Sequence, residues 1–242
     1  MEKSKIKKGQ PIFEPIKYED YKKEEGIVEI YKNQDWNKIV PLILDAVDHT
    51  KNNEKVYGNY PYFRAKTKLD FLPKLDIPSD ILSAIQLKQI YEFLPDSHQY
   101  SDLYRVFSIS VDGSSLKTFY NKCQDINNSI LVIKDDDGNI FGAYASENFE
   151  PNKNFSGTGE CFLFSFYKNN KIHVFNSTGI NRFYMYCDDE QISFGCSDDY
   201  FSLSLRNDFL EGYTQTTQTY QNLLLSSKDK FTIVKLELWG FE

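Results

Sequence analysis

GTGECFLFSF, residues 157–166, is the stretch that decides the fold. Two glycines flank a threonine, a glutamate follows, and every later position except Ser165 is apolar. Such a run is typical of a strand that is buried on both faces. Glu160 stands where the glycine turn meets this strand, and there it could be a catalytic acid, a metal ligand or a structural anchor.

The glycines of this stretch do not form a phosphate-binding loop. The GxxxxGK[ST] spacing is absent, and the segment that follows is a strand, so no helix N-terminus presents its amides to an anion. Gly157 and Gly159 therefore indicate a tight turn or a close backbone approach. We expect the Glu160 carboxylate to be buried and to accept backbone N–H bonds from a neighbouring loop, and a functional role is the alternative.

Strand signals dominate the second half of the chain. Asp136, Asp137 and Gly138 separate two apolar segments and predict a β-hairpin. Further strands are predicted, with turn residues between them, at 161–167, 171–175, 182–187, 191–195, 201–205 and 231–241. Many hairpin-connected strands with few helices indicate a two-sheet antiparallel β-sandwich, an α+β chain that is mainly β.

Two amphipathic helices and one strand precede these segments. Residues 79–95 contain the capping-box spacing of Ser83 and Gln86, and Pro95 ends the pattern. The apolar side of this helix is formed by Ile85, Leu87, Ile90, Tyr91 and Leu94. Residues 103–111 predict a strand, and residues 113–123 predict a short helix capped by Ser114 or Ser115. We expect these helices to lie at the periphery of the sandwich.

Composition and charge exclude several classes of function. The formal net charge is −7, and an acidic surface repels nucleic acid and anionic lipid. No segment has the roughly 18 consecutive apolar residues of a transmembrane helix. The first 15 residues lack the apolar core of a signal peptide. We expect a cytoplasmic protein with no nucleic-acid partner and no transmembrane segment.

Few residues offer catalytic or metal-binding chemistry. The four cysteines form no CxxC pair, and in a reducing compartment they are core residues rather than a disulfide framework. His173 alternates with apolar neighbours in a predicted strand, which is typical of a structural histidine. Asp135–Gly138 resembles the start of a calcium loop but lacks its alternating ligands and closing glutamate. We expect no cofactor, no metal and no catalytic residue.

The first 75 residues differ in composition from the rest. Seven of the eight prolines lie at or before Pro95, and the segment is rich in Lys, Glu and Tyr. One helical pattern near residues 36–48 has Trp36, Ile39, Ile43 and Leu44 on its apolar face. We expect residues 1–75 to form an extended arm with this short helix, and residues 76–242 to form the folded domain. The arm is either a partly disordered tail or a segment that binds a partner through these four side chains.

From about residue 79 to the end, the sequence resembles the TLDc domain of the oxidation resistance protein family. The matching strings occur in the family's order. They are DGSSLKTFYNKC at 112–123, LVIKDDDGNIFGAYASENFEP at 131–151, FSGTGECFLFSF at 155–166, ISFGCSDDYFSLSLRNDFLEGYTQTTQTYQNLLLSS at 192–227 and LELWGFE at 236–242. Cys196–Asp199 stands where the family often has a run of glycines, so this loop departs from the family's pattern.

The resemblance implies a two-sheet β-sandwich with peripheral helices. It also implies protection against oxidative stress and binding to the vacuolar-type proton ATPase, whose assembly some relatives regulate. No accepted catalytic site comes with the family. The matched motifs therefore identify fold-defining residues or part of a recognition surface, namely Gly142, Ser146, Gly157, Gly159, Glu160, Glu237 and Trp239.

Three functions remain open from the sequence. The first is a non-enzymatic interaction module that docks on a large assembly, with the vacuolar-type proton ATPase as the candidate that the resemblance suggests. The second is a structural subunit of another assembly, such as a cytoskeletal or ciliary complex, which the long aromatic arm favours. The third is a thiol-based peroxide scavenger, which needs an exposed thiolate of lowered pKa. Cys196, in a predicted loop, fits that need better than Cys161, which begins a buried strand.

Overall fold

The computed structural model describes residues 71–166, 170–198 and 200–242. The predicted helix near 36–48 and the arm residues Trp36, Ile39, Ile43 and Leu44 lie outside the described residues. Among the helices that the structure describes, none is long and apolar enough to cross a membrane.

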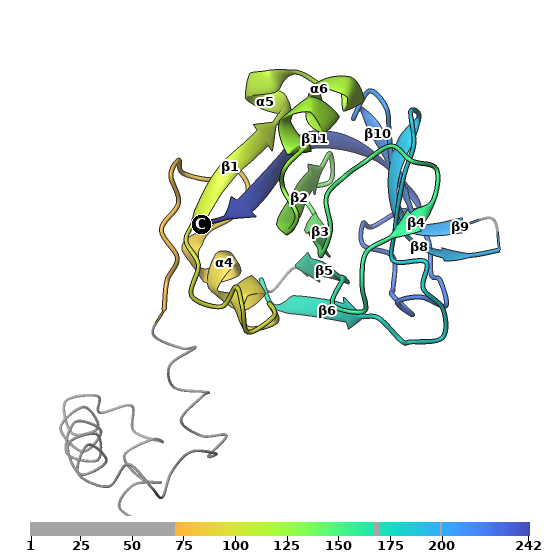
Figure 1. The fold of residues 1–242 in the computed structure, drawn as a ribbon, viewed down its shortest axis with the longest axis horizontal. Coiled ribbons are helices and arrows are strands. Elements are labelled where there is room, and N and C mark those ends of the chain that lie inside the picture. The colour runs from red at the N-terminus through yellow and green to blue at the C-terminus, as the bar shows by residue number, and fades with distance from the viewer. Residues whose placement is uncertain (1–70, 167–169, 199) are drawn as a thin grey trace, which may run out of the picture. The chain divides into compact units, whose positions relative to one another are not determined.

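The described chain consists mainly of antiparallel strands, with three short helices (Figure 1). In chain order the elements are α4 (Ala84–Tyr91), β1 (Leu103–Ser108), α5 (Ile109–Asp112), α6 (Leu116–Cys123), β2 (Ser129–Asp135), β3 (Ile140–Ala145), β4 (Phe155–Ser156), β5 (Phe162–Phe166), β6 (Ile172–Asn176), β7 (Met185–Cys187), β8 (Gln191–Ser197), β9 (Tyr200–Arg206), β10 (Glu211–Thr214) and β11 (Lys230–Phe241). The predicted class, mainly β with peripheral helices, is confirmed.

The strands form two layers that share β11. Sheet A has the order β1-β11-β2-β3-β5-β6, and sheet B has the order β4-β7-β8-β9-β10-β11. The start of β11, Lys230–Thr232, pairs with β10, whereas its end, Glu237–Phe241, pairs with β1. The register with β2 shifts between Ile233 and Lys235, and a bulge of this kind bends a strand. The single strand β11 therefore passes from one layer into the other.

The central strands of sheet A, β2, β3 and β5, are buried on both faces. In β2, Leu131 and Ile133 belong to the core that also contains Phe194 and Leu203 of sheet B. The intervening residues of β2 face a second core, which includes Leu87 and Ile90 of α4. This double burial explains why the strands of sheet A have continuous apolar runs instead of a simple alternation.

The helices follow the predicted caps but differ in length. Ser83 and Gln86 form the predicted capping box at α4, and the Ser115 side chain caps α6. α4 ends at Tyr91, four residues before Pro95. Ile85 is 71% exposed, so its assignment to the apolar side was wrong. The predicted strand 103–111 ends at Ser108 because the chain turns there into α5.

Candidate functional site

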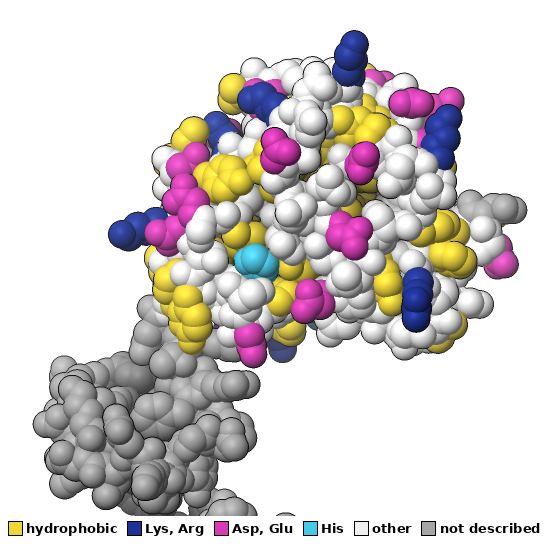
Figure 2. Space-filling model, viewed as in Figure 1, with side chains coloured by type: hydrophobic (Ala, Val, Ile, Leu, Met, Phe, Trp, Pro, Cys, Tyr) yellow, Lys and Arg dark blue, Asp and Glu magenta, His cyan; other side chains and the backbone are white. Residues whose placement is uncertain are grey.

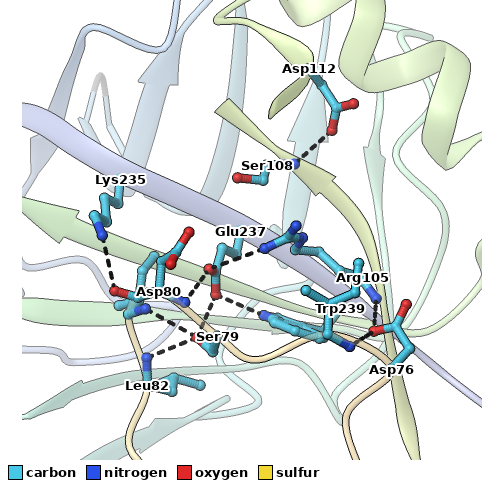
Figure 3. Close-up of polar contacts among 12 residues, drawn as sticks. Asp76, Ser79, Asp80, Leu82, Arg105, Ser108, Asp112, Lys235, Glu237 and Trp239 are labelled. Atoms are coloured by element: carbon cyan, nitrogen blue, oxygen red, sulfur yellow. Dashed lines mark hydrogen bonds and ion pairs between the residues drawn. The ribbon is translucent and has the colours of Figure 1, made fainter. Parts of the chain in front are cut away.

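A buried carboxylate lies at the junction of the last strand and the segment before α4 (Figure 3). Glu237 of β11 is 1% exposed. Its Oε2 accepts hydrogen bonds from Ser79 Oγ at 2.6 Å and from Trp239 Nε1 at 3.1 Å. Its Oε1 accepts one from the Asp80 backbone N–H at 2.8 Å and lies 4.0 Å from Nη1 of Arg105. We call these five residues the Glu237 cluster.

The Glu237 cluster ties together parts of the chain that are far apart in sequence. Ser79 donates to Glu237 and also accepts from the backbone N–H groups of Ile81 and Leu82, at 3.1 and 2.9 Å. Lys235 of β11 donates to the Asp80 carbonyl oxygen at 3.2 Å. The turn that leads into α4 is therefore held to β11 through one carboxylate and its neighbours.

Residues just before this turn also contact sheet A. Leu75 forms a parallel bridge with Leu103 of β1, and the Phe71 ring lies 5.9 Å from that of Tyr91 and 5.5 Å from that of Tyr100. Residues 71–75, which the sequence assigned to the arm, therefore pack on the sandwich.

A second carboxylate fixes the end of β1. Asp112 of α5 accepts from the Ser108 backbone N–H at 2.9 Å and forms an ion pair with Lys122 of α6 at 2.7 Å. Burial raises the pKa of Asp112, but the hydrogen bonds from Lys122 and Ser108 outweigh burial, so this pKa lies below its usual value. Asp112 therefore stays ionised and holds α5 and α6 together.

The GTGE loop, residues 157–160, is a second cluster. Its Gly157 has a φ of +86°, which favours glycine, and donates its backbone N–H to Glu147 at 3.0 Å. The Thr158 backbone N–H donates to Ser146 Oγ at 2.8 Å, and this oxygen lies 3.2 Å from Cys161 Sγ. The structure thus brings Ser146, Gly157 and Cys161 together. No hydrogen bond or ion pair between described residues joins this loop to the Glu237 cluster.

Glu160 does not have the buried position that the sequence predicts. The residue is exposed, and its own backbone N–H donates to Thr158 Oγ1 at 3.2 Å. The interpretation as a buried anchor is wrong because the chain enters the core only at the next residue. Burial lowers the pKa of the His98 imidazole, and the charge of the Glu160 carboxylate opposes that shift. A recognition role for Glu160 stays a prediction.

Gly142 lies at the centre of sheet A. A Cβ atom there would lie 1.9 Å from the Leu131 carbonyl oxygen and 2.8 Å from the Phe164 ring, so no larger residue fits. Gly159 has no such constraint, since its nearest neighbour would be Tyr184 Oη at 3.7 Å. A fold-defining role is therefore easier to explain for Gly142 than for Gly159.

Three of the four thiols are buried, and burial raises their pKa values. The pKa of Cys187 is raised to about 12, and those of Cys123 and Cys161 are also raised. Cys196 is only partly buried, and its Sγ lies 3.7 Å from the Asp198 carbonyl oxygen. Reactive thiolate chemistry is therefore disfavoured at the three buried positions. The described residues include no group of three or more His, Cys, Asp or Glu that could hold a metal ion.

Sequence reasoning missed three of the four partners of Glu237, although it named Trp239. Ser79, Asp80 and Arg105 carry no local signal for this contact, because they lie more than 130 positions from Glu237 in the chain. His98 was assigned only to a loop, although its ring stacks on Phe241 with the ring centroids 4.3 Å apart. For Ser79 and Asp80, the one local signal is Pro78, which indicates a turn at this point of the chain.

Comparisons with known proteins match most of the chain. A family model described as the TLDc domain matches residues 75–242. Oxidation resistance protein 1 of Xenopus tropicalis is 38% identical over 173 residues, and that of Homo sapiens is 36% identical over 173 residues. Each alignment covers 71% of this chain and 20% of the relative.

One further relative aligns with nearly the whole chain. Nuclear receptor coactivator 7 of Gallus gallus is 31% identical over 238 residues, which is 98% of this chain and 26% of that protein. The chain thus spans only about a fifth to a quarter of the curated relatives it matches. Because it covers 98% of the chain, this alignment also includes residues before 75. The family motifs quoted above all lie at 112–242.

Proposed function

The chain belongs to the TLDc domain family, and from this premise we propose that it is a non-enzymatic protein-interaction module. In this proposal the module acts in the cytoplasm, docks on a large assembly and contributes to resistance against oxidative stress. The vacuolar-type proton ATPase is the proposed assembly. A cytoskeletal or ciliary complex is the alternative partner, with the arm residues Trp36, Ile39, Ile43 and Leu44 as the additional contact.

One observation carries the non-enzymatic part of this proposal. The buried acid of the last family-like motif, Glu237, already accepts three hydrogen bonds from the chain itself. The thiol next to the GTGE loop, Cys161, is fully buried, and burial raises its pKa. Groups that are engaged or protonated in this way stabilise the fold and are poor nucleophiles or bases.

Surface charge supports a protein partner over a nucleic acid. Residues 71–242 contain 14 Lys and Arg against 23 Asp and Glu, a formal net charge of −9, whereas residues 1–70 contain 14 against 12, or +2. Figure 2 shows acidic side chains spread over the visible face of the domain. A partner surface that carries basic residues fits this distribution.

Affinity purification from a cell lysate tests the proposal. The full chain serves as bait beside a version that begins at Phe71, and the captured proteins are identified by mass spectrometry. We expect subunits of one assembly with the full chain and a weaker capture with the shorter version. Recovery of no assembly by either bait would contradict the docking proposal.

A second candidate function, thiol-based peroxide removal, rests on Cys196 alone, which is the least buried of the four thiols. We expect the purified protein to consume hydrogen peroxide no faster than its Cys196→Ser variant. Rapid turnover that Cys196→Ser abolishes would favour the scavenger over the interaction module.

A further inference from the structure

A row of side chains crosses the outer face of sheet B. The pairing of β4, β7, β8, β9 and β10 places five residues side by side, namely Phe155, Tyr186, Ser193, Ser204 and Tyr213. Their neighbours along the strands, such as Met185, Ile192 and Leu205, lie in the core between the sheets. Since side chains alternate along a strand, the row points away from that core.

The middle of this row is a groove. Ser204 lines its floor, and the Ser204 hydroxyl accepts a hydrogen bond at 3.0 Å from the hydroxyl of Ser193, which is fully buried. Tyr186 and Tyr213 stand on either side, three strand spacings or about 14 Å apart at the backbone. A hollow of about 360 Å³ lies over Ser204. Between two tyrosine rings, such a width admits one extended chain.

Aromatic rings continue along one side of the groove. Phe201 stacks on Tyr186 with the ring centroids 5.8 Å apart, and Phe155 lies 5.4 Å from Tyr186 and 4.5 Å from Phe183. Tyr200, which is 61% exposed, lines the hollow. Figure 2 shows apolar side chains at the edge of the molecule where β4 and β9 lie in Figure 1. These rings present flat apolar faces to solvent.

Three side chains around the hollow have N–H groups that are available to a ligand. Gln191, Arg206 and Gln215 line it, and no described residue accepts a hydrogen bond from their side-chain N–H groups. Arg206 lies over the Tyr213 ring, 5.4 Å from its centroid. The one carboxylate, Asp229, already accepts from the neighbouring Lys230 backbone N–H at 2.9 Å. The N–H groups of Gln191, Arg206 and Gln215 therefore suit an extended ligand that offers carbonyl acceptors.

We propose that this groove binds a proline-rich segment of a protein partner in the polyproline II conformation, an inference that rests on the proposed interaction function. Prolines have a carbonyl acceptor but no N–H donor, and their rings pack on aromatic faces. A polyproline II chain is extended, and it loses little conformational freedom on binding. The donors of Gln191, Arg206 and Gln215 would bind its carbonyl groups, while Tyr186, Tyr200 and Tyr213 would contact its rings.

The test titrates the full chain into fluorescein-labelled decaproline and follows fluorescence anisotropy. We expect saturable binding, and no binding of a ten-residue Gly-Ser peptide with the same label. Tyr200→Ala and Tyr213→Ala should each weaken decaproline binding by about tenfold or more. Tyr100→Ala is the matched control, since Tyr100 is 54% exposed but lies outside the groove, and it should bind like the wild type. Thermal melting checks that every variant is folded.

Backbone NMR spectra of the same titration locate the site. We expect shifts at Gln191, Ser204, Arg206 and Tyr213. No saturable binding, equal binding of the Gly-Ser peptide, or binding that folded Tyr200→Ala and Tyr213→Ala variants retain would overturn the inference. Shifts at these residues with maltohexaose but not with decaproline would overturn it in favour of a saccharide. If affinity purification captures an assembly while decaproline does not bind, the groove inference fails and the proposed function stands. If decaproline binds but affinity purification captures no assembly, the groove inference stands and the proposed docking on an assembly fails.

Discussion

Replacing Glu237 with glutamine should destabilise the domain although the shape of the side chain is kept. The carboxylate offers acceptors on both oxygens, and both are used, by Trp239 and Ser79 on Oε2 and by the Asp80 backbone on Oε1. A glutamine side chain has one oxygen and one NH2 group. Whichever way the amide is turned, its NH2 group faces a fixed N–H donor.

The size of the effect follows from that mismatch. One buried donor without a partner costs about 1–3 kcal/mol, so we expect Glu237→Gln to lower the free energy of unfolding by about 2 kcal/mol. Glu237→Ala leaves both N–H donors unpaired and removes the charge beside Arg105, at a cost of about 4 kcal/mol. For a domain of this size, 1 kcal/mol corresponds to about 2–4 °C in melting temperature, which predicts decreases of about 4–8 °C and 8–16 °C.

The assay is thermal and urea denaturation of the full chain, followed by circular dichroism. Glu160→Gln is the matched control, because it is the same chemical change at an exposed glutamate of another family-like motif. Surface changes of this kind usually alter stability by less than about 0.5 kcal/mol.

Two results would refute the reasoning. The first is a Glu237→Gln variant with the melting temperature of the wild type, which would mean that the cluster holds no net stability. The second is a decrease in melting temperature for Glu160→Gln as large as that for Glu237→Gln. This result would mean that Glu160 is a buried structural anchor, although the structure shows it exposed.

Three other predictions follow from the geometry. Gly142→Ala should cost about 3 kcal/mol or prevent folding, because its Cβ would meet a backbone oxygen of the neighbouring strand at 1.9 Å; a normal urea midpoint would contradict this. NMR titration should give His98 a pKa below 6.5, because burial disfavours its charged form. Glu160→Gln should lower the His98 pKa further, and a rise in that pKa would show that the Glu160 charge does not act on the ring. Because the neutral imidazole is favoured in the folded state, the free energy of unfolding should decrease as the pH falls below 6.5. A version that begins at Phe71 should melt at a higher temperature than one that begins at Pro78, since residues 71–77 pack on β1 and α4; equal melting would show that these contacts add no stability.

Much of the local structure could be predicted from the sequence because it depends on neighbours in the chain. The hairpin of β2 and β3 requires Gly138, whose φ is +82°, at the end of an Asp-Asp-Gly turn. The capping box of Ser83 and Gln86 spans three positions, and the motif order was sufficient to identify the family. The hairpin and the capping box are each indicated by a few neighbouring residues, and the structure contains both of them.

Which of the two glutamates, Glu160 or Glu237, is buried was decided only by the tertiary structure. Glu160 and Glu237 both stand beside apolar strand residues, and the sequence favoured burial of Glu160. The donors that stabilise Glu237 come from Ser79 and Asp80, which lie 158 and 157 positions away, so no local pattern could indicate them. The groove on sheet B has the same origin, because Tyr186 and Tyr213 come to lie on either side of it only after four strands pair in register. Side-chain alternation along each strand follows from the sequence, but the neighbours across a sheet depend on the order and register of the strands.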